Sequence, residues 1–136
     1  MRSIKFLIKL IPTFLASGLC LAVILWLTLA PDPVGETHVS LFPGADKVVH
    51  ACMFGGLTLC FCLDYVKWKK QPTEDPTATF FLCGLIAACI GIGIEFLQEA
   101  MSLGRSFELW DMVSDTAGAL IAFLIVAQYW RNTHRG

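Results

Sequence analysis

The sequence predicts an all-α fold, a four-transmembrane-helix bundle that forms a single domain over residues 1–136. Three observations support this prediction. The chain has 56% hydrophobic and only 15% charged residues and a mean hydropathy of +0.66, whereas about a quarter of the residues of a soluble domain are charged. Four apolar stretches are each long enough to cross a hydrocarbon core about 30 Å thick. Lysine and arginine gather at one side of these stretches.

The first predicted span covers residues 6–29, an apolar run whose only charged residue is Lys9 near its start. A cleaved signal peptide is the competing interpretation, because the basic residues Arg2 and Lys5 precede the run. The run is too long for a typical signal peptide, and Pro31 follows the predicted cleavage point directly. We therefore expect this segment to be a retained membrane helix.

Polar segments that contain proline or glycine separate the three remaining predicted spans, 46–66, 78–101 and 111–130. Asp75 or Thr77 is expected to cap the third span. Glycine and alanine also recur at four-residue spacing within the third and fourth spans. Such small residues let neighbouring helices approach closely, so we interpret them as packing positions.

The six cysteines all lie within apolar runs, where cysteine behaves as a small hydrophobic residue. Cys60 and Cys62 are separated by a single residue and lack the spacing of a zinc site. The sequence assigns no metal site and identifies no cofactor, although the histidine and carboxylates described below could also hold a divalent cation without matching a named metal motif. The near-neutral net charge of -1 and the absence of a basic field also argue against nucleic-acid binding.

The distribution of basic residues predicts the orientation in the membrane. Eight of them lie on one side of the four spans: Arg2, Lys5, Lys9, Lys67, Lys69, Lys70, Arg131 and Arg135. Only Lys47 and Arg105 lie on the other side. Because cytoplasmic loops are enriched in lysine and arginine, both termini are expected to be cytoplasmic.

This topology brings three helix ends together at the outer leaflet. The polar residues expected there are Asp46, Lys47, His50, Glu95, Gln98, Asp111 and Asp115, with Arg105 in the loop above them. An ionised side chain at mid-bilayer costs about 2.5–3.5 kcal/mol, so residues just inside the hydrocarbon boundary should turn inward and find partners. Ionisable residues within a span are candidates for function.

Two groups with different roles are predicted within this set. His50, Glu95 and Asp115 are the candidates for acid-base catalysis, because desolvation and neighbouring charges tune carboxylate and imidazole groups. Asp46, Lys47, Gln98, Arg105 and Asp111 are the candidates for substrate binding, and Lys47 and Arg105 would suit a phosphate or carboxylate. Each residue also has a structural alternative, such as a helix cap at Asp111 or a hydrogen-bonded core histidine at His50.

The ordered motifs resemble those of the VanZ-like membrane proteins. They are Asp46-Lys47-x-x-His50, Glu95-x-x-Gln98, Gly104-Arg105-Ser106-Phe107, Asp111 and Gly118. The resemblance covers roughly residues 43–118 and implies a small four-span protein of the bacterial cytoplasmic (inner) membrane. The founding member of the family is associated with low-level teicoplanin resistance. The chain departs from the family at Asp115, where asparagine is more usual, so this position carries an extra carboxylate.

Three functions remain open from the sequence. The first is an outward-facing polar cleft that binds an anionic or amphiphilic envelope molecule, such as a lipid headgroup, a cell-wall precursor or a lipoglycopeptide. The second is an intramembrane enzyme that acts on a lipid-linked or cell-wall substrate through His50 and Glu95, although Ser114 lacks the surroundings of a nucleophile. The third is a structural or accessory protein. The lipid bilayer is the expected partner, and the sequence leaves open whether two chains pair.

Overall fold

The computed structural model describes residues 12–30, 42–70, 74–101 and 108–134. These residues form four α-helices: α2 (Leu15–Leu29), α3 (Ala45–Trp68), α4 (Thr77–Met101) and α5 (Leu109–His134). The all-helical prediction is confirmed, and the last three helices extend the predicted spans by no more than a few residues at each end.

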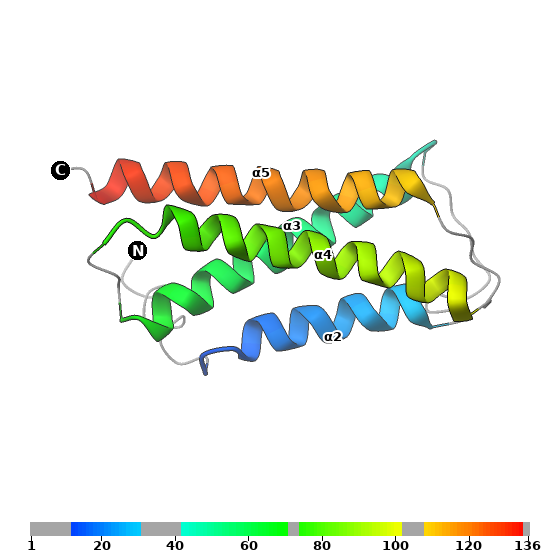
Figure 1. The fold of residues 1–136 in the computed structure, drawn as a ribbon, viewed down its shortest axis with the longest axis horizontal. Coiled ribbons are helices and arrows are strands. Elements are labelled where there is room, and N and C mark those ends of the chain that lie inside the picture. The colour runs from blue at the N-terminus through cyan, green and yellow to red at the C-terminus, as the bar shows by residue number, and fades with distance from the viewer. Residues whose placement is uncertain (1–11, 31–41, 71–73, 102–107, 135–136) are drawn as a thin grey trace.

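The four helices alternate in direction along the bundle, with α3 running obliquely across the others (Figure 1). The beginnings of α3 and α5 therefore lie at the same end as the last turn of α4 (Figure 1). We call this end, which contains Lys47, Glu95 and Asp111, the polar end. The opposite end contains the first turn of α4 and the basic residues Lys67 and Arg131 of α3 and α5.

Three helices, α3, α4 and α5, are long and apolar enough to cross a membrane. In the first predicted span the described helix, α2, has 15 residues and begins at Leu15. Pro12 explains this start, since proline in a helix interior removes a backbone hydrogen bond and clashes with the preceding turn. Phe14 takes a left-handed backbone conformation with φ 71° immediately before the helix. Residues 6–11 of the predicted span lie outside the described residues.

An apolar core joins all four helices. Its buried members are Ile24 of α2, Phe54 and Leu57 of α3, Ala87, Ala88 and Ile94 of α4, and Ala119 of α5. Toward the opposite end, Phe80 packs edge-on against Tyr65 and Trp130. The large apolar side chains on the outer faces are exposed, as expected for helices that face lipid.

The closest packing is between α3 and α5, at Gly118. A Cβ atom added there would overlap the carbonyl oxygen of Ala51 and lie 2.7 Å from its carbonyl carbon. Gly55 is in close contact with the same turn of α5, because its added Cβ would lie 3.1 Å from the Gly118 carbonyl oxygen. The predicted packing role of Gly118 is confirmed, and this contact brings the side chains of α3 and α5 together at the polar end.

Two polar contacts fix α2 to its neighbours. Ser17 donates from its hydroxyl and its backbone N–H to Asp64 Oδ2, at 2.6 and 3.3 Å. Near the other end of α2, Gln98 Nε2 donates to the carbonyl oxygen of Thr28 at 2.7 Å. The predicted cap of the third span is also present, since Asp75 Oδ1 accepts hydrogen bonds from the backbone and hydroxyl of Thr77.

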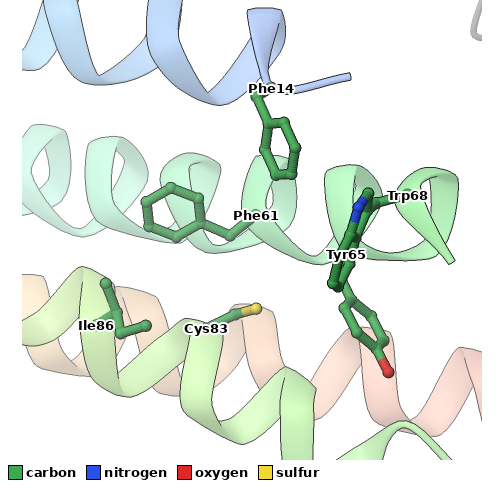
Figure 2. Close-up of a pocket in the computed structure, with 6 residues that line it drawn as sticks. All are labelled: Phe14, Phe61, Tyr65, Trp68, Cys83 and Ile86. Carbon is green, nitrogen blue, oxygen red and sulfur yellow. The ribbon is translucent and has the colours of Figure 1, made fainter.

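An apolar groove of about 270 Å³ lies between α2, α3 and α4 toward the opposite end (Figure 2). It is lined by Phe14, Phe61, Tyr65, Trp68, Cys83 and Ile86. Phe14 projects from the start of α2 toward α3, and in this view its ring lies between Phe61 and the exposed Trp68 (Figure 2). This lining offers apolar contact and almost no hydrogen-bonding groups, so the groove differs in chemistry from the polar end.

Candidate functional site at the polar end

Lys47 lies on the first turn of α3, and three carboxylates surround its ammonium group. Its Nζ is 2.7 Å from Asp46 Oδ2 and 2.7 Å from Asp111 Oδ1, and it also forms an ion pair with Glu108. The acceptors come from α3, from the start of α5 and from the residue just before α5. The charge of Lys47 is therefore already matched within the chain.

His50 lies one turn further along α3 and contacts the first two turns of α5. Its Nδ1 is 2.9 Å from Asp115 Oδ1, a hydrogen-bonding distance, and its Nε2 is 3.9 Å from Asp111 Oδ2. Asp115 is only 1% exposed. A buried carboxylate of this kind orients the imidazole and favours its Nδ1-protonated tautomer.

Glu95 approaches the same place from α4 and is also only 1% exposed. Its Oε2 accepts a hydrogen bond of 3.3 Å from the backbone N–H of Glu108. Its Oε1 is buried and has no hydrogen-bond partner among the described residues. One ligand atom from each of His50, Glu95 and Asp115 lies within 4.8 Å of the other two. The three residues predicted to share acid-base chemistry are thus close together.

Gly91 makes room for this group one turn below Glu95. A Cβ atom added at Gly91 would lie 2.7 Å from Asp115 Oδ2 and 2.9 Å from Asp115 Cβ, closer than real contacts allow. By contrast, a Cβ atom added at Gly93 would meet nothing within 4 Å. The lack of a side chain at Gly91 therefore permits Asp115 to occupy its buried position beside α4.

The remaining two predicted binding residues differ from this group. Gln98 is buried, and its amide nitrogen is used by the contact with Thr28 of α2. The described hydrogen bond of Gln98 therefore joins α4 to α2. Arg105 lies outside the described residues, so its predicted role at the site stays a prediction.

The described ionisable side chains make the polar end acidic. Five carboxylates, from Asp46, Glu95, Glu108, Asp111 and Asp115, gather around one lysine and one histidine. Such an arrangement can bind a cation or an amine and can accept and donate protons. An anion would need a positive charge beyond that of Lys47.

A family model described as VanZ/LLP1 matches residues 7–130. The chain belongs to the VanZ/LLP1 family. It is also similar to the uncharacterized protein C11E3.10 of Schizosaccharomyces pombe, with 29% identity over 109 residues, 80% of this chain and 63% of that protein. The chain thus spans less than two thirds of the length of this relative. No solved structure matches this chain.

VanZ/LLP1 membership together with three membrane-capable helices makes this chain a VanZ-like membrane protein. Among the motifs quoted from the sequence, the first two and Asp111 contribute to the polar end of this VanZ/LLP1 chain, whereas residues 104–107 lie outside the described residues. Lys47 and His50 come from the first motif, Glu95 and Gln98 from the second, and Asp111 contacts both Lys47 and His50.

Sequence reasoning missed two polar residues in this VanZ/LLP1 chain, Glu108 at the polar end and Asp64 at the opposite end. Glu108 supplies a carboxylate to Lys47 and a backbone N–H to Glu95. Its position three residues before Asp111 was the available signal, because residues at that spacing share a helix face. Asp64 is buried at 2% exposure within α3. Placing an acidic side chain in an apolar span is costly for Asp64 as it is for Glu95. The sequence therefore could have predicted that Asp64 also has a hydrogen-bonding partner.

Proposed function

We propose that this VanZ-like protein binds an amphiphilic molecule of the cell envelope at its polar end. The observation that carries the proposal is the convergence of ionisable side chains from three helix ends on one end of an otherwise apolar bundle. The surface beside this end is apolar, with exposed Val48, Val49, Phe96, Leu109 and Trp110. A molecule with a polar headgroup and an acyl chain matches this combination, because each part meets its own kind of surface.

The orientation belongs to the same proposal. The end of the bundle that carries Lys67 and Arg131 faces the cytoplasm, and the polar end faces the outer leaflet of the cytoplasmic membrane. A carboxy-terminal reporter fusion tests this arrangement. Green fluorescent protein fused to the end of the chain should fluoresce, and alkaline phosphatase at the same place should be inactive. The reverse pattern would place the site on the cytoplasmic side and exclude an outer-leaflet ligand.

The charge of the polar end favours a headgroup that carries an amine. The sequence alone predicted an anionic or amphiphilic ligand, with Lys47 as one of the binding groups. The pairing of Lys47 with Asp46, Glu108 and Asp111 supports a different preference. A headgroup amine can exchange into this carboxylate cluster, whereas an anionic headgroup meets excess negative charge unless Arg105 or a bound cation offsets it.

Native mass spectrometry of the protein in mixed nanodiscs tests the headgroup preference. The bilayers contain equal amounts of phosphatidylethanolamine and phosphatidylglycerol. Wild-type protein should retain phosphatidylethanolamine preferentially, and D111N should lose that preference by several-fold. Glu99→Gln is the control, because Glu99 is an exposed carboxylate of α4 that is not among the partners of Lys47. Equal retention of both lipids by wild type would overturn the amine preference, and no lipid retention would overturn binding itself.

A link to glycopeptide resistance follows from the family association of the founding member. Teicoplanin and the lipid-linked cell-wall precursors are amphiphiles that meet the outer leaflet, where this site is proposed to lie. Expression of the wild-type chain in a sensitive host should raise the teicoplanin concentration that stops growth. D111N at equal protein level should not. A phenotype that follows only the amount of protein would instead support a structural or accessory role.

An intramembrane enzyme is the second candidate, and the His50–Asp115 contact favours it. A carboxylate 2.9 Å from Nδ1 orients an imidazole as in known acid-base catalysts. Glu95 supplies a second acid-base group within reach. The hydroxyl of Ser114 donates to the carbonyl of Trp110 within its own helix, so the nucleophile of this candidate is a water molecule activated by His50 or Glu95. Turnover of a lipid-linked substrate that disappears in both His50→Gln and Glu95→Gln would establish this candidate.

A further inference from the structure

We propose that His50, Glu95 and Asp115 form a binding site for a divalent transition-metal ion. This inference goes beyond the binding of an amphiphile and does not depend on it. The three residues lie along separate parts of the sequence, on α3, α4 and α5, so their spacing matches no metal motif. The site is recognised only when the helices are assembled.

The distances between the three ligand atoms are close to those found around a bound metal ion. Zinc and manganese lie about 2.0–2.2 Å from nitrogen and oxygen ligands, which places those ligands roughly 3–4 Å from one another. One atom from each of His50, Glu95 and Asp115 lies within 4.8 Å of the others. Binding of an ion would require these atoms to move closer together by about 1 Å.

The second observation is the unmatched oxygen of Glu95. The side chain is 1% exposed, and its Oε1 accepts no hydrogen bond from any described residue. Leaving one oxygen of a buried carboxylate without a partner is unfavourable. A cation beside Oε1 would remove this cost, and the nearby carboxylate of Asp115 would add to the attraction.

The position of Asp111 beside the His50 ring also suits metal binding. When the ion takes the Nδ1 position now bonded to Asp115, the ring keeps its proton on Nε2. That atom lies 3.9 Å from Asp111 Oδ2, so a slight approach gives a hydrogen bond to the other ring nitrogen. Metal-bound histidines commonly have such a carboxylate partner, which fixes the ring and raises its basicity.

The donor set indicates the kind of ion. One imidazole and two carboxylates suit zinc or manganese, while magnesium and calcium prefer oxygen ligands alone. Three protein ligands also leave coordination positions for water or for a ligand group. The neighbouring group of Asp46, Glu108 and Asp111 is less suited, because Lys47 occupies the space between its carboxylates.

Metal content of the untagged protein in nanodiscs tests the site. The protein is stripped with a chelator, dialysed against zinc or manganese at a fixed free concentration and measured by mass spectrometry of the metal. Wild type should hold about one equivalent, and both Glu95→Gln and Asp115→Asn should weaken binding at least 10-fold. Glu99→Gln and His134→Ala are the controls, because both residues are exposed and lie outside the cluster.

A second measurement covers variants that fail to fold. Cobalt added to the stripped wild-type protein should give a visible absorption spectrum typical of mixed nitrogen and oxygen ligands. Gly91→Ala, which displaces Asp115 but removes no ligand, should alter that spectrum, whereas Gly93→Ala should not. Wild type that holds no metal above the controls, or Glu95→Gln that holds as much as wild type, would overturn the site. Lipid retention measured in the same samples reports separately on amphiphile binding.

Discussion

Two buried carboxylates at opposite ends of the bundle, Asp64 and Glu95, differ in how many hydrogen bonds they receive. Asp64 at the opposite end is 2% exposed and receives two hydrogen bonds from Ser17 at one oxygen. Glu95 at the polar end is 1% exposed and receives one backbone hydrogen bond, while its other oxygen is unpartnered among the described residues. The first carboxylate has the partners of a structural contact. The second has the unmet binding capacity expected of a functional group.

The largest expected effect comes from Gly118→Ala, which tests whether the polar end depends on the close approach of α3 and α5. The new methyl group would overlap the backbone of Ala51 and force the helices apart. We expect a loss of at least about 3 kcal/mol in stability, at the upper end for overpacking. Thermal unfolding in detergent measures it.

The control for this substitution is Gly56→Ala, where an added Cβ meets nothing within 4 Å. Alanine is the better helix former, so Gly56→Ala should be neutral or slightly stabilising. Similar unfolding temperatures for the two variants would show that α3 and α5 can separate without cost. The position of Asp115 beside His50 would then need another cause.

Ser17→Ala should have an intermediate effect at the opposite end. The substitution removes the 2.6 Å hydroxyl bond to Asp64 and leaves the weaker backbone bond at 3.3 Å. A buried charged acceptor that loses its partner costs about 1–3 kcal/mol. Chemical unfolding followed by circular dichroism measures the loss, and metal and lipid binding at the polar end should be unchanged. A binding defect would show that the two ends are not independent.

The smallest effect on stability is expected for Glu95→Gln. Glutamine keeps an oxygen for the N–H of Glu108 and removes a buried charge that is only partly matched, so the two contributions nearly offset. We expect a change within about 1 kcal/mol by the same unfolding measurement, together with loss of binding function. A destabilisation larger than that of Ser17→Ala would show that Glu95 is a structural residue like Asp64, and the proposed difference between the two carboxylates would be wrong.

The helices could be predicted from the sequence because their apolar runs are long and their ends are marked by charge and proline. Within the first predicted span, residues 12–14 are not helical and α2 begins at Leu15, because Pro12 restricts the backbone. The part of that span before residue 12 lies outside the described residues, so its start stays a prediction. Membrane composition alone does not distinguish a continuous helix from one that begins after a proline. The sidedness of the basic residues predicts an orientation that stays a prediction.

The site could be predicted in part. Inward-facing ionisable residues near three helix ends pointed to His50, Glu95 and Asp115. Periodicity within one helix does not reveal which atoms meet across helices, so the ion pairs of Lys47 with Glu108 and Asp111 were not predicted. These contacts change the charge available to a ligand. The partner of Asp64 was missed because it comes from the middle of a distant apolar run, where a serine carries little signal.

The two attachments of α2 imply an order of assembly during synthesis. Ser17 and Thr28 leave the ribosome before Asp64 and Gln98, the residues that hold them in the finished protein. Helix α2 therefore lacks these two contacts until α3 and α4 have been synthesised. Its final docking depends on segments made later. Truncated chains that stop before α4 keep the Asp64 contact but lack Gln98, so the end of α2 at Thr28 should be loosely attached and open to hydrogen exchange.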